Sequence, residues 1–320
     1  MNVHGKDIKI FAGNSNIPLA EEIAKKIGLP LGSALVGAYS DGESAITIGE
    51  VVRGSDVFIV QSTSNPVNDN LMELLVMIDA LKRASAGRIT TVIPYYGYAR
   101  QDRKAKARDP ISAKLVANLI TIAGADRILT MDFHAPQLQG FFDIPVDHLQ
   151  GFPILAEYFR ETHDDLSDVI VVSPDVGSVT RSRKFAQRLE IPLAIIDKRR
   201  SKANESQVMN IIGDVKNKKV ILVDDIIDTG GTIVNAANEL SKMGAKEIYA
   251  CCSHAVLSGK ASEKINNSSI KELVTLNTIP VKENNKIKNA SVLSVATVFA
   301  EAIERIYGDI SISTIFTQKE

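Results

Sequence analysis

The sequence lacks net charge, long apolar runs and disulfide-forming cysteine pairs. Lysine and arginine total 37 against 38 acidic residues, so no overall positive field gathers nucleic acid or an anionic membrane. No window approaches about 18 uninterrupted apolar residues, and no charged segment followed by an apolar one opens the chain, so we expect neither a membrane span nor an export signal. Cys251 and Cys252 are neighbours in an apolar run and would point to opposite faces of a strand, so we expect no ordinary disulfide and a cytoplasmic location.

Several common catalytic motifs are also missing. No GxxxxGK[ST] segment occurs, so a nucleotide is not bound through a P-loop, and neither a Ser-His-Asp pattern nor a zinc-ligand spacing is present. The chain does have length and apolar content, because 320 residues with 45% hydrophobic residues suffice for about two domains with real cores. We therefore expect a globular protein in which any binding of anions depends on local groups of residues and not on the overall charge.

Strand-like runs alternate with helical patterns along the whole chain. This alternation predicts an α/β fold in which mainly parallel sheets are flanked by helices. The pattern is interrupted by the turn-forming residues Pro145, Gly151 and Pro153, so we expect domains at 1–147 and 148–320. The last helix could return to the first domain. The expected strands are 8–12, 57–61, 89–95, 127–131, 169–173, 193–197, 220–223 and 247–252, and the expected helices are 18–27, 71–85, 112–123, 179–189, 232–243 and 294–306.

The most informative segment is ILVDDIIDTGGT at 221–232. The run Val220–Val223 predicts a strand buried on both faces, which puts Asp224 and Asp225 at its C-terminal end, where ligands of open α/β sheets bind. Apolar residues at helical spacing then follow from Ile233, and Gly244 stands where a left-handed helix stop is expected. The turn between them therefore leads into a helix N-terminus.

That turn has the chemistry of a phosphate cradle. Gly230 and Gly231 free backbone N–H groups to converge on an anion, the helix dipole favours negative charge, and Thr229 and Thr232 add hydroxyl donors. The vicinal hydroxyls of a ribose donate hydrogen bonds to carboxylates, so ribose 5-phosphate is the predicted occupant. The alternative interpretation is a helix cap preceded by solvated acids.

A cationic segment at 98–110, YARQDRKAKARDP, lies between an expected strand and an expected helix. Its five cations are Arg100, Arg103, Lys104, Lys106 and Arg108. Their mutual repulsion predicts a mobile loop that a polyphosphate orders, and such a loop could act as a lid that excludes water. A solvated basic loop is the alternative, whereas a nucleic-acid-binding module is disfavoured because no aromatic residues are interleaved with the cations.

Three further turns carry polar residues at strand ends. Asp132 and His134 lie two apart and share one face of an extended segment, so they could grip a metal or a metal-bound phosphate, although a lone histidine more often has a structural role. The turn SPDVGS at 173–178 is a second candidate anion loop. Lys198 and Arg200 also share one face, where two cations can stabilise a charged transition state.

Together these segments make the chain resemble the ribose-phosphate pyrophosphokinases, also called phosphoribosyl pyrophosphate synthetases, over essentially its whole length. The acidic loop alone would indicate only the wider phosphoribosyltransferase group. The additional matches are YSDGE at 39–43, STSNPVNDNLMELLVMIDALKRASA at 62–86, PYYGYARQDRK at 94–104, DFHAPQLQGFFDIPVDHL at 132–149 and DKRR at 197–200.

The resemblance implies an activity. Members of this family transfer the diphosphoryl group of MgATP to the 1-hydroxyl of ribose 5-phosphate, which gives 5-phosphoribosyl 1-diphosphate and AMP for nucleotide, histidine and tryptophan biosynthesis. It also implies Mg²⁺ as the cofactor, two phosphoribosyltransferase-type domains, and a homo-oligomer that is a hexamer built from dimers.

The resemblance also implies roles for individual residues. The catalytic cations are expected to be Lys198, Arg200 and Arg100, and the magnesium positions His134 and Asp175. Contacts to ATP are expected from Tyr39, Asp41, Gly42, Glu43, Arg100, Gln101 and His134. Contacts to ribose 5-phosphate are expected from Arg200, Asp224, Asp225, Asp228, Thr229, Gly230, Gly231 and Thr232. A regulatory phosphate or ADP site is expected at Arg53, Ser311 and Ser313.

Two positions depart from the family pattern. Gly177 is followed by Ser178 where relatives usually carry a second glycine, and serine tolerates positive φ poorly, which bears on the geometry of the diphosphate loop. Serine can also donate its hydroxyl, and we still favour an active enzyme. Val51 stands near Arg53 where relatives commonly carry a polar residue, which bears on phosphate activation and ADP inhibition.

Two other functions compete with an active synthetase. A synthetase-like regulatory subunit of low or no activity is favoured by Ser178 and disfavoured by the intact cations Lys198, Arg200 and Arg100. A phosphoribosyltransferase that consumes phosphoribosyl diphosphate shares the acidic loop but does not need the YSDGE and YARQ segments.

Overall fold

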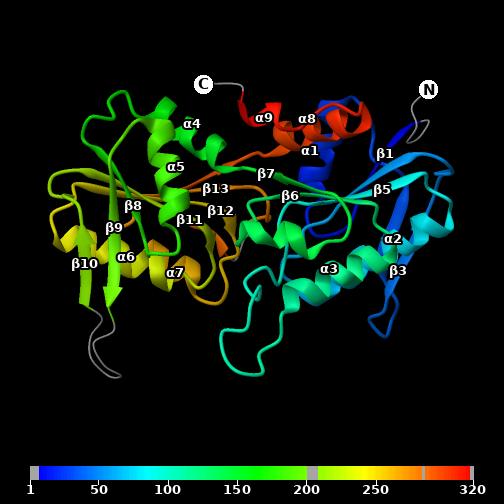
Figure 1. Ribbon diagram of the computed structural model, residues 1–320, viewed down its shortest axis with the longest axis horizontal. Helices are drawn as coiled ribbons and strands as arrows, with labels where there is room; N and C mark the ends of the chain where they lie inside the picture. Colours follow the sequence, from blue (N-terminus) through cyan, green and yellow to red (C-terminus); the bar gives the residue numbers. More distant parts are fainter. Residues whose placement is uncertain (1–6, 200–207, 283–284, 318–320) are drawn as a thin grey trace. The chain divides into compact units, whose positions relative to one another are not determined.

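The computed structural model describes residues 7–199, 208–282 and 285–317. The chain divides into two compact units, of which unit 1 comprises residues 1–150, 278–280 and 294–320, and unit 2 comprises residues 151–277 and 281–293. Each unit contains a mainly parallel sheet flanked by helices, so the predicted α/β fold class is confirmed (Figure 1).

Unit 1 is built on a five-stranded parallel sheet in the order β1-β4-β5-β6-β7. The strands are β1 (Ile8–Ala12), β4 (Asp56–Val60), β5 (Arg88–Ile93), β6 (Arg127–Met131) and β7 (Val146–Leu149). The helices are α1 (Ile17–Ile27), α2 (Val67–Arg83), α3 (Ser112–Ala123), α8 (Ala296–Tyr307) and the short α9 (Thr314–Thr317), with a 3-10 turn at Pro136–Phe141. α2 and α3 cover one face of the sheet and α1 and α8 the other (Figure 1).

A separate antiparallel hairpin, β2 (Ala34–Ala38) and β3 (Ser44–Ile48), completes the strands described in unit 1. Leu35 on this hairpin is 74% exposed, so the pair has little of the burial that marks the central strands. This weak apolar pattern is the reason that the sequence did not predict it.

Unit 2 is built on a seven-stranded sheet in the order β10-β9-β8-β11-β12-β13-β14, in which only β10 is antiparallel to its neighbour. The strands are β8 (Val169–Ser173), β9 (Leu193–Arg199), β10 (Val208–Ile212), β11 (Lys219–Ile227), β12 (Glu247–Ala255), β13 (Glu272–Leu276) and β14 (Ala290–Leu293). The helices are α4 (Phe152–Thr162), α5 (Val179–Leu189), α6 (Gly231–Lys242) and α7 (Ala261–Asn266). α4 and α5 lie on one face of this sheet and α6 and α7 on the other (Figure 1).

The strand order of unit 2 contains a topological switch point. From β8 the chain crosses to β9 on one side, whereas from β11 it crosses to β12 on the other side, although β8 and β11 are hydrogen-bonded neighbours. Loops that leave two such strands diverge, so a crevice opens at the carboxyl ends of β8 and β11. The turn that follows β8 and the acids of β11 therefore lie at the position where open α/β sheets bind ligands.

Every predicted strand and helix is present, with ends that shift by a few residues. The sequence did not predict β2, β3, β7, β10, β13, β14, α4, α7, α9 and the 3-10 turn at Pro136–Phe141. Some of these elements carry weak signals, since the edge strand β14 is never fully buried and α4 opens at the Gly151–Pro153 punctuation that predicted a boundary. Within the described ranges, none of the helices combines the length and apolar character that a membrane crossing requires.

Candidate functional site

The two adjacent acids of the predicted phosphosugar loop lie inside a strand rather than after it. β11 extends to Ile227, so the expectation that the strand ends at Val223 was wrong. The physical reason is that β11 keeps its pairing with β12 to the end, whereas its pairing with β8 stops at Leu222. Asp224 and Asp225 therefore stand beyond the end of β8, in the crevice at the switch point.

A set of donors from the turn after β8 converges on these acids. The Ser178 hydroxyl donates to Asp224 Oδ1 at 3.1 Å, and the backbone N–H of Asp225 donates to the same oxygen at 2.9 Å. Arg181 Nη1 lies 2.9 Å from Asp225 Oδ1 and 3.5 Å from Asp224 Oδ1. The turn itself is closed by the Ser178 N–H, which donates to Asp175 Oδ1 at 2.9 Å. Arg181 thus bridges Asp224 and Asp225, and Ser178 bridges Asp224 and Asp175.

The electrostatics of this cluster favour an incoming cation or hydrogen-bond donor. Burial, followed by the neighbouring Asp225 carboxylate, raises the pKa of Asp224 from 3.8 to about 7, with Asp175 adding to the rise and Arg181 opposing it. Burial and the neighbouring carboxylates thus both disfavour the charged form of Asp224, and vicinal hydroxyls or a metal ion would compensate for this.

Ser178 is accommodated without strain. Its φ of −88° and ψ of −1° are ordinary right-handed values at the residue before α5, and Gly177 has no positive φ either. The serine therefore does not distort the loop, because the loop does not use the left-handed conformation that disfavours serine. The substitution instead supplies the hydroxyl that bonds Asp224.

The glycine turn leads into a helix N-terminus, as predicted. Gly230 adopts φ 72° and ψ −5°, a left-handed conformation that suits glycine, and α6 begins at the next residue, Gly231. Gly230 has no side chain with which to cap the first turn, so the N–H groups there are available to an anion. Thr229 and Thr232 are exposed beside it, and Lys264 Nζ donates to the Thr229 carbonyl at 3.2 Å. Gly244 has φ 89° where the helix stop was predicted.

The cationic segment 98–110 forms an exposed loop whose base is closed by hydrogen bonds. The Tyr96 hydroxyl donates to the Ala113 carbonyl at 2.8 Å, and the Ala113 N–H donates to the Gln101 carbonyl at 3.2 Å. The Ser112 hydroxyl donates to Gln101 Oε1. All five cations of the loop are exposed. The loop is therefore anchored at its base, and its charges face solvent.

Two family models match the sequence. The N-terminal domain of ribose phosphate pyrophosphokinase matches residues 8–124, and the phosphoribosyl synthetase-associated domain matches residues 199–317. The ribose-phosphate pyrophosphokinase of Clostridium tetani is 67% identical over 312 residues, which are 97% of this chain and 98% of that protein. The chain belongs to the ribose-phosphate pyrophosphokinase family.

Further family members give the same result. The ribose-phosphate pyrophosphokinase of Clostridium perfringens is 66% identical over 317 residues, which are 99% of both proteins. A crystal structure of phosphoribosylpyrophosphate synthetase from Mycobacterium smegmatis is 43% identical, with a TM-score of 0.90 over 95% of this chain and 100% of that chain. The protein is therefore an enzyme of the diphosphotransferase class, as the resemblance implied.

The residues for which the family suggests ATP contacts lie on exposed turns of unit 1. Tyr39 is 64% exposed at the tip of the β2–β3 hairpin. The tip is shaped by the Glu43 N–H, which donates to Asp41 Oδ1 at 3.2 Å, and by Gly42 with φ 95°. His134 follows β6 and is exposed, as is Arg100 on the cationic loop 98–110.

The catalytic cations suggested by the family fall at the edge of the described structure. Lys198 belongs to β9, where its backbone pairs with that of Met209. Arg200 lies outside the described residues. Of the two magnesium positions, His134 belongs to unit 1 and Asp175 to unit 2. In the described part of the chain, no three His, Cys, Asp or Glu side chains are close enough to hold an ion by themselves.

The regulatory residues suggested by the family are exposed on unit 1. Ser311 and Ser313 have their hydroxyls 2.7 Å apart, and Arg305 Nη1 donates to the Ser311 carbonyl at 3.0 Å. Arg53 forms a backbone bridge to Ala86, and its side chain has no hydrogen bond or ion pair with a described residue. Val51 is 81% exposed.

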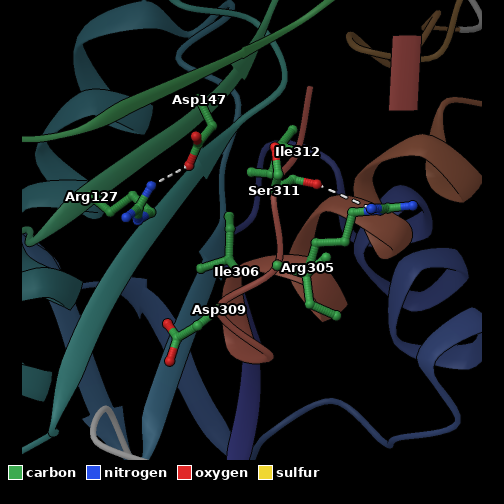
Figure 2. A pocket seen from close by; sticks show the side chains of 8 residues that line it. Arg127, Asp147, Arg305, Ile306, Asp309, Ser311 and Ile312 are labelled. Carbon is green, nitrogen blue, oxygen red and sulfur yellow. Dashed lines mark hydrogen bonds and ion pairs between the residues drawn. The ribbon is translucent and has the colours of Figure 1, made fainter. Parts of the chain in front are cut away.

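A pocket of about 330 Å³ opens beside the C-terminal segment (Figure 2). The lining includes the ion pair of Arg127 with Asp147, at 2.6 Å, and Arg305, Asp309 and Ser311 of the C-terminal segment. Charges of both signs line this pocket, so its electrostatics select no single kind of ligand.

Sequence reasoning missed Arg181, which reaches both acids of the phosphosugar loop. The sequence signal was its place in the first turn of the helix that follows SPDVGS, a segment that was itself recognised as a candidate anion loop. Its partners are 43 and 44 residues away, so only the adjacency of β8 and β11 reveals the contact.

Proposed function

We propose that the protein transfers the diphosphoryl group of MgATP to the 1-hydroxyl of ribose 5-phosphate, giving 5-phosphoribosyl 1-diphosphate and AMP. The observation that carries this proposal is the pairing of two adjacent acids, the half-buried Asp224 and the buried Asp225, with a glycine-rich helix N-terminus on one strand-turn-helix segment, 219–242, at the switch point of unit 2. The names of the most similar relatives agree with it.

The acceptor sugar fits this segment in one orientation. Its 5-phosphate would accept hydrogen bonds from the N–H groups at Gly231 and Thr232 and from the hydroxyls of Thr229 and Thr232. Its vicinal hydroxyls would donate to the carboxylates of Asp224 and Asp225, which compensates for the burial and mutual repulsion of these groups. The opposite orientation would place a phosphate against two carboxylates.

The chemical step is a displacement at phosphorus. The anomeric oxygen attacks the β-phosphorus of ATP, a new P–O bond forms as the bond between the α,β-bridging oxygen and the β-phosphorus breaks, and AMP leaves with the electron pair of that bond. The anomeric hydroxyl loses its proton. We assign charge neutralisation in the transition state to Lys198, Arg200 and Arg100, with the last of these arriving on the lid.

The donor set near the switch point fits a magnesium ion shared with substrate. Mg²⁺ prefers oxygen ligands and is usually held by one or two carboxylates together with phosphate oxygens, which agrees with the Asp175 carboxylate and with the lack of a described three-ligand cluster. We assign Asp175 and His134 to this role, the histidine acting through phosphate or water. A bound Mg²⁺ supplies charge neutralisation along the polyphosphate.

Other features of the family are proposed for this chain on the same basis. Unit 1 residues Tyr39, Asp41, Gly42, Glu43 and Gln101 would bind ATP, and Arg53, Ser311 and Ser313 would form the regulatory phosphate or ADP site. The enzyme would assemble as a homohexamer. The free thiols of Cys251 and Cys252 support a reducing, cytoplasmic location.

The decisive experiment is AMP formation from MgATP with and without ribose 5-phosphate. We expect AMP only when ribose 5-phosphate is present, and a loss of about a hundredfold in kcat for Lys198→Ala. Lys242→Ala is the matched control, because this exposed lysine pairs only with Glu239 on the surface of α6. ATP binding without AMP formation under any condition would instead support the regulatory-subunit alternative.

A further inference from the structure

We propose that Arg181 and Ser178 act as a clamp that positions the Asp224 carboxylate for the ribose hydroxyls, so that both residues serve substrate binding without touching the reacting atoms. The inference rests on the proposed function and assigns to it two positioning residues. Both belong to the turn and first helical turn after β8, whereas Asp224 belongs to β11.

The first element of the clamp is the bridging position of Arg181. A single nitrogen, Nη1, lies within ion-pair distance of Oδ1 on both Asp225 and Asp224, at 2.9 and 3.5 Å. The arginine side chain is 23% exposed and the Asp225 side chain 4%, so solvent screens this contact weakly. Two adjacent carboxylates would otherwise repel one another, and Arg181 holds them in one fixed arrangement.

The second element is the Ser178 hydroxyl. Together with the Asp225 N–H and Arg181, it saturates one oxygen of Asp224, Oδ1, with donors. The other oxygen, Oδ2, receives no hydrogen bond from any residue that the structure describes. The protein therefore fixes the orientation of the carboxylate through Oδ1 and leaves Oδ2 to accept from a ligand hydroxyl.

The serine is itself held by the loop. Its backbone N–H donates to Asp175 Oδ1 at 2.9 Å, and the residue as a whole is only 6% exposed. The hydroxyl therefore has little freedom to turn away from Asp224. A glycine at this position, which the family pattern carries, would keep the backbone conformation and lose this contact.

A purely structural role makes a different prediction from a positioning role. If the clamp only stabilised the fold, its removal would lower the melting temperature and affect both substrates alike. If it positions Asp224, its removal weakens the binding of ribose 5-phosphate and leaves ATP binding almost unchanged. Steady-state kinetics with each substrate varied in turn separate the two, because a change in KM for one substrate alone reports on that substrate's site.

The test compares Arg181→Met, Arg181→Lys, Ser178→Ala and the Arg181→Met/Ser178→Ala pair with the full-length wild type. Methionine keeps the apolar stem of the arginine and removes its charge. We expect Arg181→Met to raise the KM for ribose 5-phosphate by about tenfold or more, with the KM for ATP within about twofold, because a buried carboxylate pair loses its cation. Arg181→Lys should keep the KM for ribose 5-phosphate much closer to the wild-type value than Arg181→Met does. Ser178→Ala should raise the KM for ribose 5-phosphate about threefold. The double variant should raise this KM by less than the product of the two single effects, because both residues act on one carboxylate.

Arg183→Met is the matched control, since this exposed arginine lies on the same helix two residues further on. It should leave both KM values and the melting temperature unchanged. The inference fails if Arg181→Met leaves the KM for ribose 5-phosphate unchanged in an active enzyme. It also fails if both KM values rise together with a drop in melting temperature and lysine gives no rescue. If the wild type itself forms no AMP from ribose 5-phosphate, the proposed function falls, and the inference falls with it.

Discussion

Arg88 forms a two-pronged ion pair with Asp56 in the interior of unit 1. Arg88 Nε donates to Asp56 Oδ1 at 3.0 Å, and Nη2 donates to Oδ2 of the same carboxylate. Nη2 also donates to the carbonyl of Ile306 at 3.1 Å. The pair thus joins two neighbouring strands of the sheet to the last turn of α8, which arrives from the far end of the chain.

Removing one partner of this ion pair should destabilise the protein strongly. Arg88→Met removes the guanidinium that binds both oxygens of the completely buried Asp56 carboxylate, and we expect a loss of about 3 kcal/mol together with a clear fall in melting temperature. The Arg88→Met/Asp56→Asn double variant should recover part of this loss, since no buried charge then stands alone. Arg83→Met, at a fully exposed pair with Asp79, should leave the melting temperature unchanged. Equal melting temperatures for Arg88→Met and Arg83→Met would contradict this account.

Asp224→Asn should stabilise the ligand-free protein at alkaline pH while abolishing activity. Because the folded-state pKa of Asp224 is raised from 3.8 to about 7, the protonated form is favoured by folding. Its contribution is fully present below about pH 4 and is lost as the pH rises through 7. Above that pH the charged carboxylate is unfavourable in the folded protein, and asparagine avoids this cost.

Thermal melts at pH 5 and pH 8.5 test whether folding raises or lowers the pKa of Asp224. The melting temperature of Asp224→Asn should exceed that of the wild type at the higher pH by more than it does at the lower pH. Asp164→Asn is the control, because this aspartate is exposed. Its melting temperature should differ from that of the wild type by the same amount at both pH values. A greater advantage at pH 5 than at pH 8.5 would show that the pKa of Asp224 is lowered rather than raised.

Gly230→Ala should weaken both the fold and the phosphate cradle. At φ 72° a Cβ atom is strained, so we expect a loss of about 1 kcal/mol in stability. The binding of ribose 5-phosphate should also weaken as the turn relaxes. Gly231→Ala provides the contrast in stability, because Gly231 begins α6 with ordinary helical geometry, and an added Cβ there would meet its nearest atom at 3.9 Å. Its melting temperature should match or exceed that of the wild type, and equal losses for the two variants would refute the conformational argument.

Binding of ATP should protect the lid from proteolysis. The exposed cations at Arg100, Arg103, Lys104, Lys106 and Arg108 are all potential trypsin sites. If a polyphosphate orders the loop, limited digestion within 98–110 should slow several-fold when Mg²⁺ and a non-hydrolysable ATP analogue are added. Cleavage at Lys25 and Lys26, which end α1, serves as the internal control and should keep its rate. Unchanged cleavage of the loop at saturating nucleotide would exclude an ordered lid.

Local patterns in the sequence by themselves determined much of the site. The segment 219–242 shows an apolar run, acids, glycines and then helical periodicity, and each of these features follows from conformational preferences within a few residues. Gly230 and Gly244 adopt the left-handed conformations that their places in this pattern require. The α/β class followed in the same way, because the alternation of strands and helices is written along the chain.

The tertiary structure alone decided which of these local pieces meet. The contact of Arg181 with Asp224 and Asp225 exists because β8 and β11 are neighbours, and the true length of β11 depends on its pairing with β12. The conformation of Ser178 was likewise settled by the turn that carries it, and the bond of Arg88 to Ile306 by the return of α8 to unit 1. Such relationships depend on strand order and on packing between distant segments, which short-range preferences do not encode.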